Sequence, residues 1–425
     1  MVVPDGERSR TGSGPAAPAP VGAGPLLAGM RVVEGSAFVA APSGGMTLAQ
    51  LGADVVRFDQ IGGGLDHRRW PLTPEGRSLY WAGLNKGKKS LVADLRSPRA
   101  RELLTALIAD AGTFLTNFPA RGWLDPAALR AHRADLVTCV ITGNRDGTTA
   151  LDYTVNCAVG YPLATCPVDA EGPINHVLPA WDLLCGQMAA LGLVSADRRR
   201  LLTGEGADLR IALSDVALAV VGALGHIAEY EICGTERPRY GNDLYGAFGA
   251  EFTTADGRLI YVVGISPRQW ASLVEATGTG EAVAAIEAEQ GLDFGVEGDR
   301  FAAREALKSV FGAWIAARPF DEVARVFDEH GVCWGPYRTF GELVRDDPRC
   351  STDNELFRRV EQAGIGTYLT PGSPLAVGGA LPVEPTPAPR LGEHTEEILA
   401  ERLGLTAAEI GRLVDEGVVA GPEPD

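Results

Sequence analysis

The chain of 425 residues lacks the short motifs that identify most metal-binding, membrane and secreted proteins. Its seven cysteines include no Cys-x-x-Cys pair, so no metal site is predicted, and their odd number indicates reduced thiols. No uncharged apolar run reaches the length needed to cross a bilayer, and no signal-like apolar run occurs near the start. We therefore expect a cytoplasmic protein without a membrane partner. The formal net charge of −17 also argues against a nucleic-acid partner, because such a surface would be basic.

Common nucleotide-binding and nucleophile motifs are missing as well. The sequence has no Gly-x-Gly-x-x-Gly at a strand-to-helix turn, no Walker lysine motif and no Gly-x-Ser-x-Gly. The run from Gly62 to Gly64 follows a predicted strand, but a flexible turn is its favoured interpretation. A ligand with phosphate groups must therefore be bound in another way. Four isolated histidines are interpreted as structural residues: His132, His176, His226 and His330.

The order of apolar runs predicts the fold class. Strand-length apolar runs alternate with helical patterns through the first half of the chain, which favours an α/β fold with a mostly parallel sheet covered on both faces. The pattern then changes to a hairpin and short helices. The expected units are a disordered tail rich in Pro, Ala and Gly at 1–27, a large Rossmann-like α/β domain at 28–235, a smaller α+β domain at 245–350, and C-terminal helices at 375–425 that return to the large domain.

Three elements of this prediction have clear signals. A long helix at 180–202 ends before Gly204, which is a good stop signal. A second helix is expected at 215–230, and a hairpin at 252–263 turns at Asp256-Gly257. The expected strands of the large domain lie at 30–35, 53–59, 113–117, 136–142 and 209–213.

One acidic residue stands where open α/β sheets place their chemistry. Asp152 follows the predicted strand at 136–142 and a polar, glycine-containing segment, and it begins a helix-like stretch. Ligand sites in such sheets lie beyond the carboxyl ends of the strands, so Asp152 is a candidate catalytic residue. The alternative is that its side chain only caps the helix, which is the more common role for Asp at such a position.

A compact basic segment, from Leu84 to Ser90, stands out in this acidic chain. One interpretation is a solvated turn. The other is capture of phosphate groups by lysines and backbone donors, with Arg57, Arg68 and Arg69 as neighbours in sequence.

Several segments together resemble the class III CoA-transferases, the formyl-CoA transferase or CaiB/BaiF type. The likeness runs from about Leu27 to the C-terminus. The segments that carry it are 33–42, Leu51 to Asp59 (family pattern LGADVIK), Asn85 to Ser90 (NKRS), Thr116 to Phe118 (ENF), Thr203 to Gly206 with Ser214-Asp215, Gly331 to Tyr337, and Leu391 to Thr395 (LGEHT). Each is modest alone, but all occur in the family's order.

The resemblance implies a site for CoA, which enters as part of the substrate, and no permanently bound cofactor. Asp152 matches the family's catalytic aspartate. The residues that the resemblance assigns to CoA are Val39, Ala40, Arg57, Lys88, Lys89, Asn117 and Arg121. Arg121 is expected to replace a family arginine, because the segment after Asn117 is shortened here. Leu151 precedes the acid where the racemase branch has histidine, which argues against proton shuttling at an α-carbon.

A second set of segments is similar to one branch of the family. These are 32–42, 152–156, 176–182 and 245–249. That branch acts as an isomerase of the 3-hydroxypropionate route, and it moves CoA from one carboxyl of 2-methylfumarate (mesaconate) to the other. The likeness implies an aspartyl mixed anhydride and an aspartyl-CoA thioester. Two alternatives stay open: intermolecular transfer between an acyl-CoA and a free mono- or dicarboxylic acid, and a non-catalytic acyl-CoA binding protein.

The family's members form interlocked homodimers, in which each chain threads through a ring in the other. The resemblance implies the same partner here, a second copy of this chain, with segments 225–245 and 350–375 connecting the two sides of the ring. The glycine-rich segment 240–249 has two interpretations, a cover that excludes water from the site and a plain linker.

Overall fold

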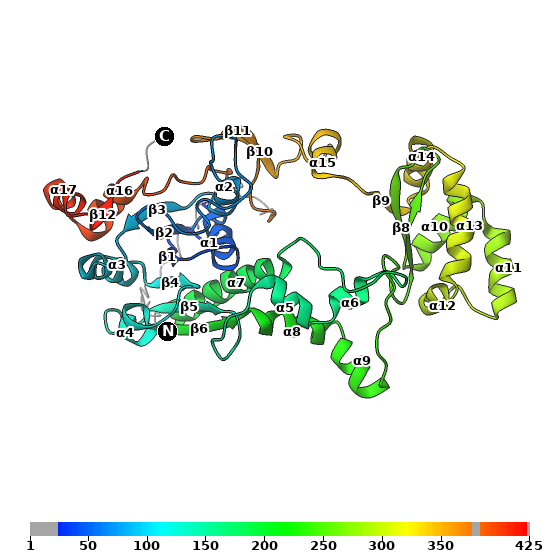
Figure 1. Cartoon of the computed structure of the whole chain (residues 1–425), viewed down its shortest axis with the longest axis horizontal. Helices are drawn as coiled ribbons and strands as arrows, with labels where there is room; N and C mark the ends of the chain where they lie inside the picture. The colour runs from blue at the N-terminus through cyan, green and yellow to red at the C-terminus, as the bar shows by residue number, and fades with distance from the viewer. Residues whose placement is uncertain (1–23, 376–382, 423–425) are drawn as a thin grey trace, which may run out of the picture.

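A seven-stranded sheet is the central feature of the computed structural model, which describes residues 24–375 and 383–422 (Figure 1). The predicted tail at 1–27 lies almost entirely outside the described residues. Strands β3, β2, β1, β4, β5 and β6 follow one another in parallel, and β12 joins the edge antiparallel to β3. Their bounds are β1 Arg31–Gly35, β2 Asp54–Gln60, β3 Lys89–Ala93, β4 Thr113–Thr116, β5 Val137–Thr142, β6 Ala207–Ala212 and β12 Val419–Ala420.

Helices cover both faces of this sheet. Successive side chains of β1 point to opposite faces: Val32 packs in one core cluster and Val33 in the other, and both are almost fully buried. Burial on both faces explains why a central strand such as β5, with the sequence VTCVIT, is mostly apolar. The helices of the first cluster are α1 (Ala40–Gln50), α7 (Ala180–Thr203) and α8 (Leu213–Ala223), and those of the second are α3 (Pro98–Ala111), α16 (Thr395–Leu403) and α17 (Ala407–Asp415).

A separate three-stranded antiparallel sheet lies at the other end of the molecule's long axis (Figure 1). Its own core is rich in aromatic residues, among them Phe248, Trp270, Phe311 and Phe327. The elements are β7 (Phe248–Thr253), β8 (Leu259–Gly264), β9 (Cys333–Pro336), α10 (Pro267–Thr277), α11 (Gly280–Gln290), α12 (Glu297–Ala302), α13 (Arg304–Ala316) and α14 (Phe320–His330).

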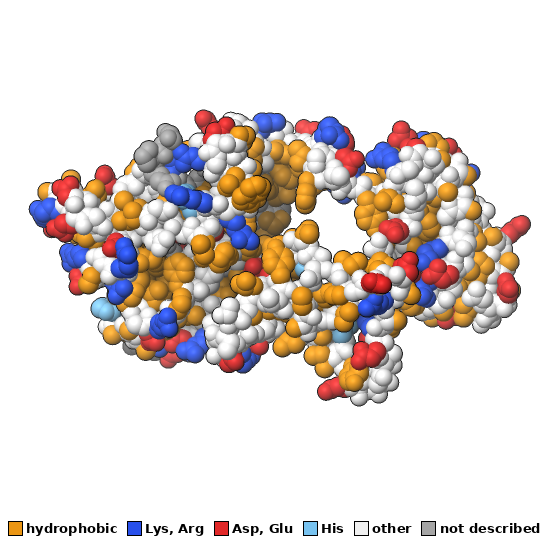
Figure 2. Space-filling view, viewed as in Figure 1, with side chains coloured by type: hydrophobic (Ala, Val, Ile, Leu, Met, Phe, Trp, Pro, Cys, Tyr) orange, Lys and Arg blue, Asp and Glu red, His pale blue; other side chains and the backbone are white. Residues whose placement is uncertain are grey.

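Two stretches of chain join the two sheets and leave an opening through the molecule. Figure 2 shows this opening beside α6 and α15 and next to the three-stranded sheet. The remaining elements are α2 (Leu79–Leu84), the 3₁₀ turn η1 (Gly122–Leu124), α4 (Pro126–Arg130), α5 (Asp152–Ala158), α6 (Tyr161–Thr165), α9 (His226–Cys233), α15 (Phe340–Asp346), β10 (Phe357–Gln362) and β11 (Gly366–Pro371).

The predicted mixed α/β fold with a large, mostly parallel sheet is confirmed. Helix α7 ends at Gly204 and the hairpin turns at Gly257, as expected. The single helix predicted at 215–230 is wrong, because Gly225 has a φ of 80° and divides it into α8 and α9. A left-handed residue cannot continue a right-handed helix. The residue limits of the domains stay a prediction.

Among the described residues, no single helix has the length and composition to span a bilayer, although α8 and α9 meet that criterion together as a pair bent by 60°.

Candidate active site

The strand order reverses between β1 and β4, and a polar clasp forms where these two strands end. Asn117 follows β4, and its Oδ1 accepts a hydrogen bond from the Ala37 amide at 2.9 Å. Its Nδ2 donates to the Ala37 carbonyl oxygen at 2.7 Å. Thr116 adds a hydrogen bond from its hydroxyl to the Gly35 carbonyl oxygen at 2.6 Å. These contacts fix the β1–α1 loop, residues 36–39.

The fixed loop holds a strained residue. Phe38 has a φ of 65° and is the one non-glycine residue with positive φ in the described part of the chain. A bulky residue in this region is uncommon, and such strain persists where the surrounding contacts enforce it, often at functional sites. Here the Asn117 clasp on the preceding residue enforces it. The strained Phe38 ring and the next two residues, Val39 and Ala40, line a large cleft.

Asp152 is the first residue of α5, and its side chain is only 2 % exposed. It does not cap its own helix, because Leu151 occupies the N-cap position and its amide donates to Thr154 Oγ1. Instead, Asp152 Oδ2 accepts hydrogen bonds from the backbone amides of Trp181 at 2.7 Å and Asp182 at 3.0 Å. The carboxylate therefore caps the first turn of α7, a helix that begins 28 residues later in the sequence.

The two oxygens of the Asp152 carboxylate therefore have different surroundings. The two amides at the N-terminus of α7 hold Oδ2 in a fixed orientation. The other oxygen, Oδ1, is buried and has no hydrogen-bond partner among the described residues. An unpartnered carboxylate oxygen in a poorly hydrated position retains its lone pairs for reaction with an electrophile.

A second carboxyl group lies beside the first. Burial raises the pKa of Asp182 to about 6, the negative charge of Asp152 adds to this effect, and the positive charge of Arg69 opposes it. Trp181 links the start of α7 to α5, because its indole N–H donates to Asn156 Oδ1 at 3.1 Å. The ring of Tyr161 stacks on Trp181 with 5.8 Å between the centroids. The catalytic candidate is thus surrounded by groups that fix its position.

The cleft has a volume of about 1170 Å³, which is ample for a large ligand. It extends from the β1–α1 loop across the ends of β4 and β5 to the start of α7. The structure brings five of the predicted site residues together along it: Val39, Ala40, Asn117, Arg121 and Asp152.

Two other predicted site residues lie beneath the β1–α1 loop and do not line the cleft. Lys88 is fully buried, and its Nζ contacts Glu34 Oε1 at 2.8 Å and Asn85 Oδ1 at 2.9 Å. Arg57 is equally buried and binds Asp59, and it also donates to the Ser36 carbonyl oxygen of the loop. Burial lowers the pKa of Lys88 to about 8, although Glu34 opposes this shift.

Lys89 lies elsewhere. As the first residue of β3, it pairs with Glu397 of α16 at 2.7 Å on a partly exposed surface. The assignment of Arg57, Lys88 and Lys89 to CoA stays a prediction.

Four residues near Asp152 line the cleft and were not among the predicted site residues: Phe38, Arg69, Tyr80 and Asp182. A signal for two of them was present in the sequence. Arg69 stands among the arginines noted near the basic segment, and Asp182 closes the segment 176–182 that carries the closer resemblance. In the described ranges, no group of three or more His, Cys, Asp or Glu side chains is arranged to hold a metal ion.

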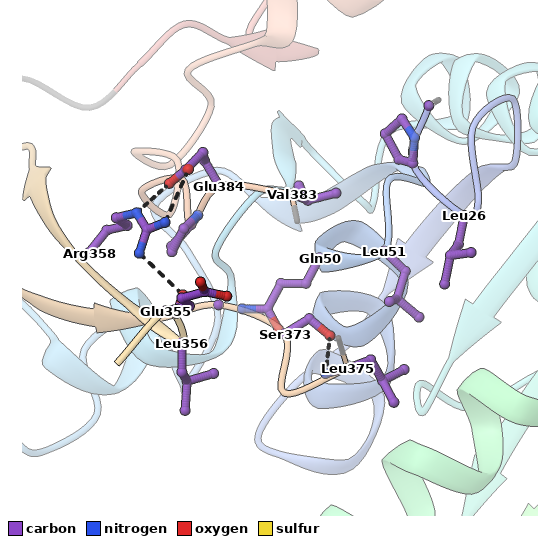
Figure 3. A pocket seen from close by; sticks show the side chains of 14 residues that line it. Leu26, Gln50, Leu51, Glu355, Leu356, Arg358, Ser373, Leu375, Val383 and Glu384 are labelled. Carbon is purple, nitrogen blue, oxygen red and sulfur yellow. Dashed lines mark hydrogen bonds and ion pairs between the residues drawn. The ribbon is translucent and has the colours of Figure 1, made fainter. Parts of the chain in front are cut away.

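A second hollow, of about 40 Å³, lies between the end of α1 and the β10–β11 hairpin (Figure 3). Three of its polar side chains are already occupied, since Arg358 pairs with Glu384 at 2.9 Å and Gln50 reaches the Pro371 carbonyl oxygen. This hollow is best explained by the packing of the hairpin on α1.

Comparisons with known proteins identify the family of this chain. Residues 27–395 match CoA-transferase family III. The chain is 58 % identical over 405 residues to 2-methylfumaryl-CoA isomerase of Chloroflexus aurantiacus, covering 94 % of this chain and 98 % of that protein. It is 28 % identical over 393 residues to succinyl-CoA:mesaconate CoA-transferase of Haloarcula hispanica, covering 88 % and 95 %.

The solved structures agree with the sequence relatives. A crystal structure of a CaiB/BaiF family protein from Brucella suis superposes with a TM-score of 0.73 at 25 % identity, and the match covers 89 % of this chain and 99 % of that one. The resemblance predicted from the sequence is confirmed, and the chain belongs to CoA-transferase family III.

Proposed function

We propose that this protein moves CoA from one carboxyl group of 2-methylfumarate to the other, with Asp152 as the nucleophile. The observation that carries this proposal is the Asp152 carboxylate itself. One oxygen is anchored at the N-terminus of α7, and the other is buried and unpartnered at a cleft large enough for an acyl-CoA. The 58 % identity to 2-methylfumaryl-CoA isomerase over nearly the whole chain supports the choice of substrate.

The proposed reaction begins with attack of Asp152 Oδ1 on the thioester carbonyl carbon. The carbon–sulfur bond breaks, CoA leaves as the thiolate, and a mixed anhydride links the acid to the enzyme. The thiolate then attacks the aspartyl carbonyl carbon of the anhydride. The carbon–oxygen bond to the acid breaks, which releases a free dicarboxylate and leaves CoA on Asp152 as a thioester.

The second half reverses these steps with the other carboxylate. That group attacks the aspartyl thioester, forms a new anhydride and displaces the CoA thiolate. The thiolate attacks the carbonyl carbon of the substrate, and Asp152 leaves as a carboxylate. Each anhydride is sensitive to water, so the buried position of Asp152 favours transfer over hydrolysis.

The remaining predicted residues enter the proposal in two groups. We place CoA along Val39, Ala40, Asn117 and Arg121, because these residues share the cleft with Asp152. The reversal of strand order at this edge supports the position, since open α/β sheets bind nucleotide ligands there. The buried residues act indirectly in this proposal: Arg57 supports the β1–α1 loop through the Ser36 carbonyl oxygen, and Lys88 supports the first turn of α1 through the Pro42 carbonyl oxygen.

We also propose the interlocked homodimer as the working form. The opening in Figure 2 supports it, because an interlocked pair requires a ring through which the other chain passes. Many large apolar side chains on α7, on α8, on α9 and at the α8–α9 junction are exposed in the single chain, which is typical of a surface that a partner covers: Met188, Leu191, Leu218, Leu224, Ile227, Tyr230 and Ile232. Monomeric behaviour at micromolar concentration in size-exclusion chromatography would contradict this arrangement.

The direct test is turnover of the synthetic regioisomers of 2-methylfumaryl-CoA, separated by chromatography. Asp152→Ala is expected to lower turnover on the order of 10⁴-fold or more, because the nucleophile is lost. Asp353→Ala, which removes an exposed carboxylate outside the cleft, is the matched control and should retain full activity. Turnover by Asp152→Ala at the wild-type rate would refute the proposal.

Intermolecular transfer is the second candidate, favoured by the similarity to succinyl-CoA:mesaconate CoA-transferase. Labelled free mesaconate distinguishes the two functions. Incorporation of the label into the CoA ester at the full rate of transfer would indicate that the acid leaves and enters the site. Isomerisation without incorporation is expected if the diacid is retained.

A further inference from the structure

Four arginines are the basic residues among the described residues that line the cleft. They lie on different walls: Arg69 after β2, Arg121 after β4, Arg145 after β5 and Arg210 on β6. Arg145 is already paired with Asp215 at 2.8 Å. For the other three, no ion pair with a described residue is formed.

Arg69 differs from the other cleft arginines because two aromatic rings lie next to its guanidinium group. Its guanidinium carbon lies 5.6 Å from the centroid of the Phe38 ring and 5.3 Å from that of Tyr80. Aromatic faces attract a guanidinium without satisfying its N–H donors, so a cation between two rings is positioned but still able to bind an anion. The Phe38 ring is itself fixed by the strained loop that Asn117 clasps.

Arg69 also lines the same cleft as Asp152 and Asp182. Its positive charge lowers the pKa of both Asp182 and Tyr80, against the dominant effect of burial on each. The backbone amide of Asp182 holds Asp152 Oδ2 at 3.0 Å. An acyl group whose carbonyl carbon meets Asp152 therefore lies in the cleft that Arg69 also lines.

We infer that Arg69 binds the carboxylate of the acyl group that is not joined to CoA, and so selects thioesters of short dicarboxylic acids. The inference rests on the proposed function and names the group that fixes its substrate class. The guanidinium fork matches a carboxylate through two parallel hydrogen bonds, which a single ammonium cannot reproduce.

This assignment gives the intramolecular reaction a simple geometry. When the acid is released from the anhydride, both of its ends are carboxylates. The end at Arg69 and the end at Asp152 exchange places as the diacid turns, and Arg69 can bind whichever end is not reacting. Retention of the diacid by this pair of contacts favours isomerisation over escape.

The test compares two thioesters on wild-type protein and the Arg69→Gln variant. One is 2-methylfumaryl-CoA, and the other is 2-methylbut-2-enoyl-CoA, which carries a methyl group in place of the second carboxylate. The readout is the rate at which the enzyme–CoA adduct forms at low substrate concentration, followed by intact protein mass. Arg69→Gln should slow the reaction of the dicarboxylic thioester about 10- to 100-fold, the usual effect of losing a charged hydrogen bond. The reaction of the methyl analogue should change by less than about threefold.

Two further variants test whether the effect is specific to Arg69 and to its guanidinium group. Arg121→Gln, an exposed arginine of the same cleft, should affect both thioesters equally, because it is not expected to contact the acyl group. Arg69→Lys should retain only part of the preference for the dicarboxylic thioester over the methyl analogue. Equal losses on both thioesters in Arg69→Gln, or no loss on the dicarboxylic one, would overturn the inference. Absence of any adduct in the wild-type protein would instead count against the proposed function.

Discussion

The double role of Asp152 leads to a prediction about stability that is separate from catalysis. Its carboxylate is both the proposed nucleophile and the cap of α7, with hydrogen bonds of 2.7 and 3.0 Å to the Trp181 and Asp182 amides. Asp152→Ala leaves both amides without an acceptor. Loss of a helix cap typically costs about 0.5–2 kcal/mol, and one buried unpaired amide, here that of Trp181, about 1–3 kcal/mol. We therefore expect Asp152→Ala to lower the free energy of local unfolding at the N-terminus of α7 by about 2–4 kcal/mol.

Asp152→Asn is the matched variant, because it keeps one oxygen that can accept from the same amides but removes the charge. In this variant the free energy of local unfolding at the N-terminus of α7 should fall by only about 1 kcal/mol. The assay is hydrogen exchange at the Trp181 and Asp182 amides, which follows local opening without assuming two-state unfolding of a large chain. Both variants should lose turnover. Unchanged exchange in Asp152→Ala, or equal losses in the two variants, would refute the capping role.

Three other predictions concern neighbouring features. Because the pKa of Asp182 is raised to about 6 in the folded chain, the folded state binds the extra proton between about pH 4 and 6. Stability should therefore fall as pH rises through that window, and Asp182→Asn should remove up to about 3 kcal/mol of this dependence in denaturant titrations. Asn117→Ala should release the β1–α1 loop, lower stability by about 1–3 kcal/mol and raise the KM for the CoA ester, as chemical denaturation and steady-state kinetics would measure. Gly186→Ala should destabilise the contact between α1 and α7 by about 1–3 kcal/mol or more, since the added Cβ would lie 2.6 Å from the Ala40 carbonyl oxygen; a thermal unfolding midpoint equal to that of the wild type would contradict this packing.

Local signals predicted much of the fold. Alternating apolar runs gave the parallel strands, and Gly204 marked the end of α7 because a left-handed glycine commonly terminates a helix. Asp152 was identified as a candidate because it follows a strand and starts a helix. The sequence also carried the family resemblance, which the comparisons confirm.

The remaining features depend on contacts between distant segments. The partners of Asp152 lie 29 and 30 residues away, so its role as the cap of another helix was not visible in the local pattern. Lys88 was predicted to lie on a solvated turn or to bind phosphate groups, but it is buried and pairs with Glu34, 54 residues earlier in the chain. The edge strand β12 contains only two residues and pairs with β3 from the far end of the chain, too short a signal for any periodicity.

The most direct test of the proposed mechanism is the identity of the residue that carries CoA during turnover. The protein should be mixed with 2-methylfumaryl-CoA, quenched rapidly and digested, and the CoA-bearing peptide identified by mass spectrometry. We expect a thioester on Asp152, absent in Asp152→Asn and not formed on the neighbouring Asp182. A CoA adduct on any other residue, or full isomerisation with no adduct at all, would contradict it.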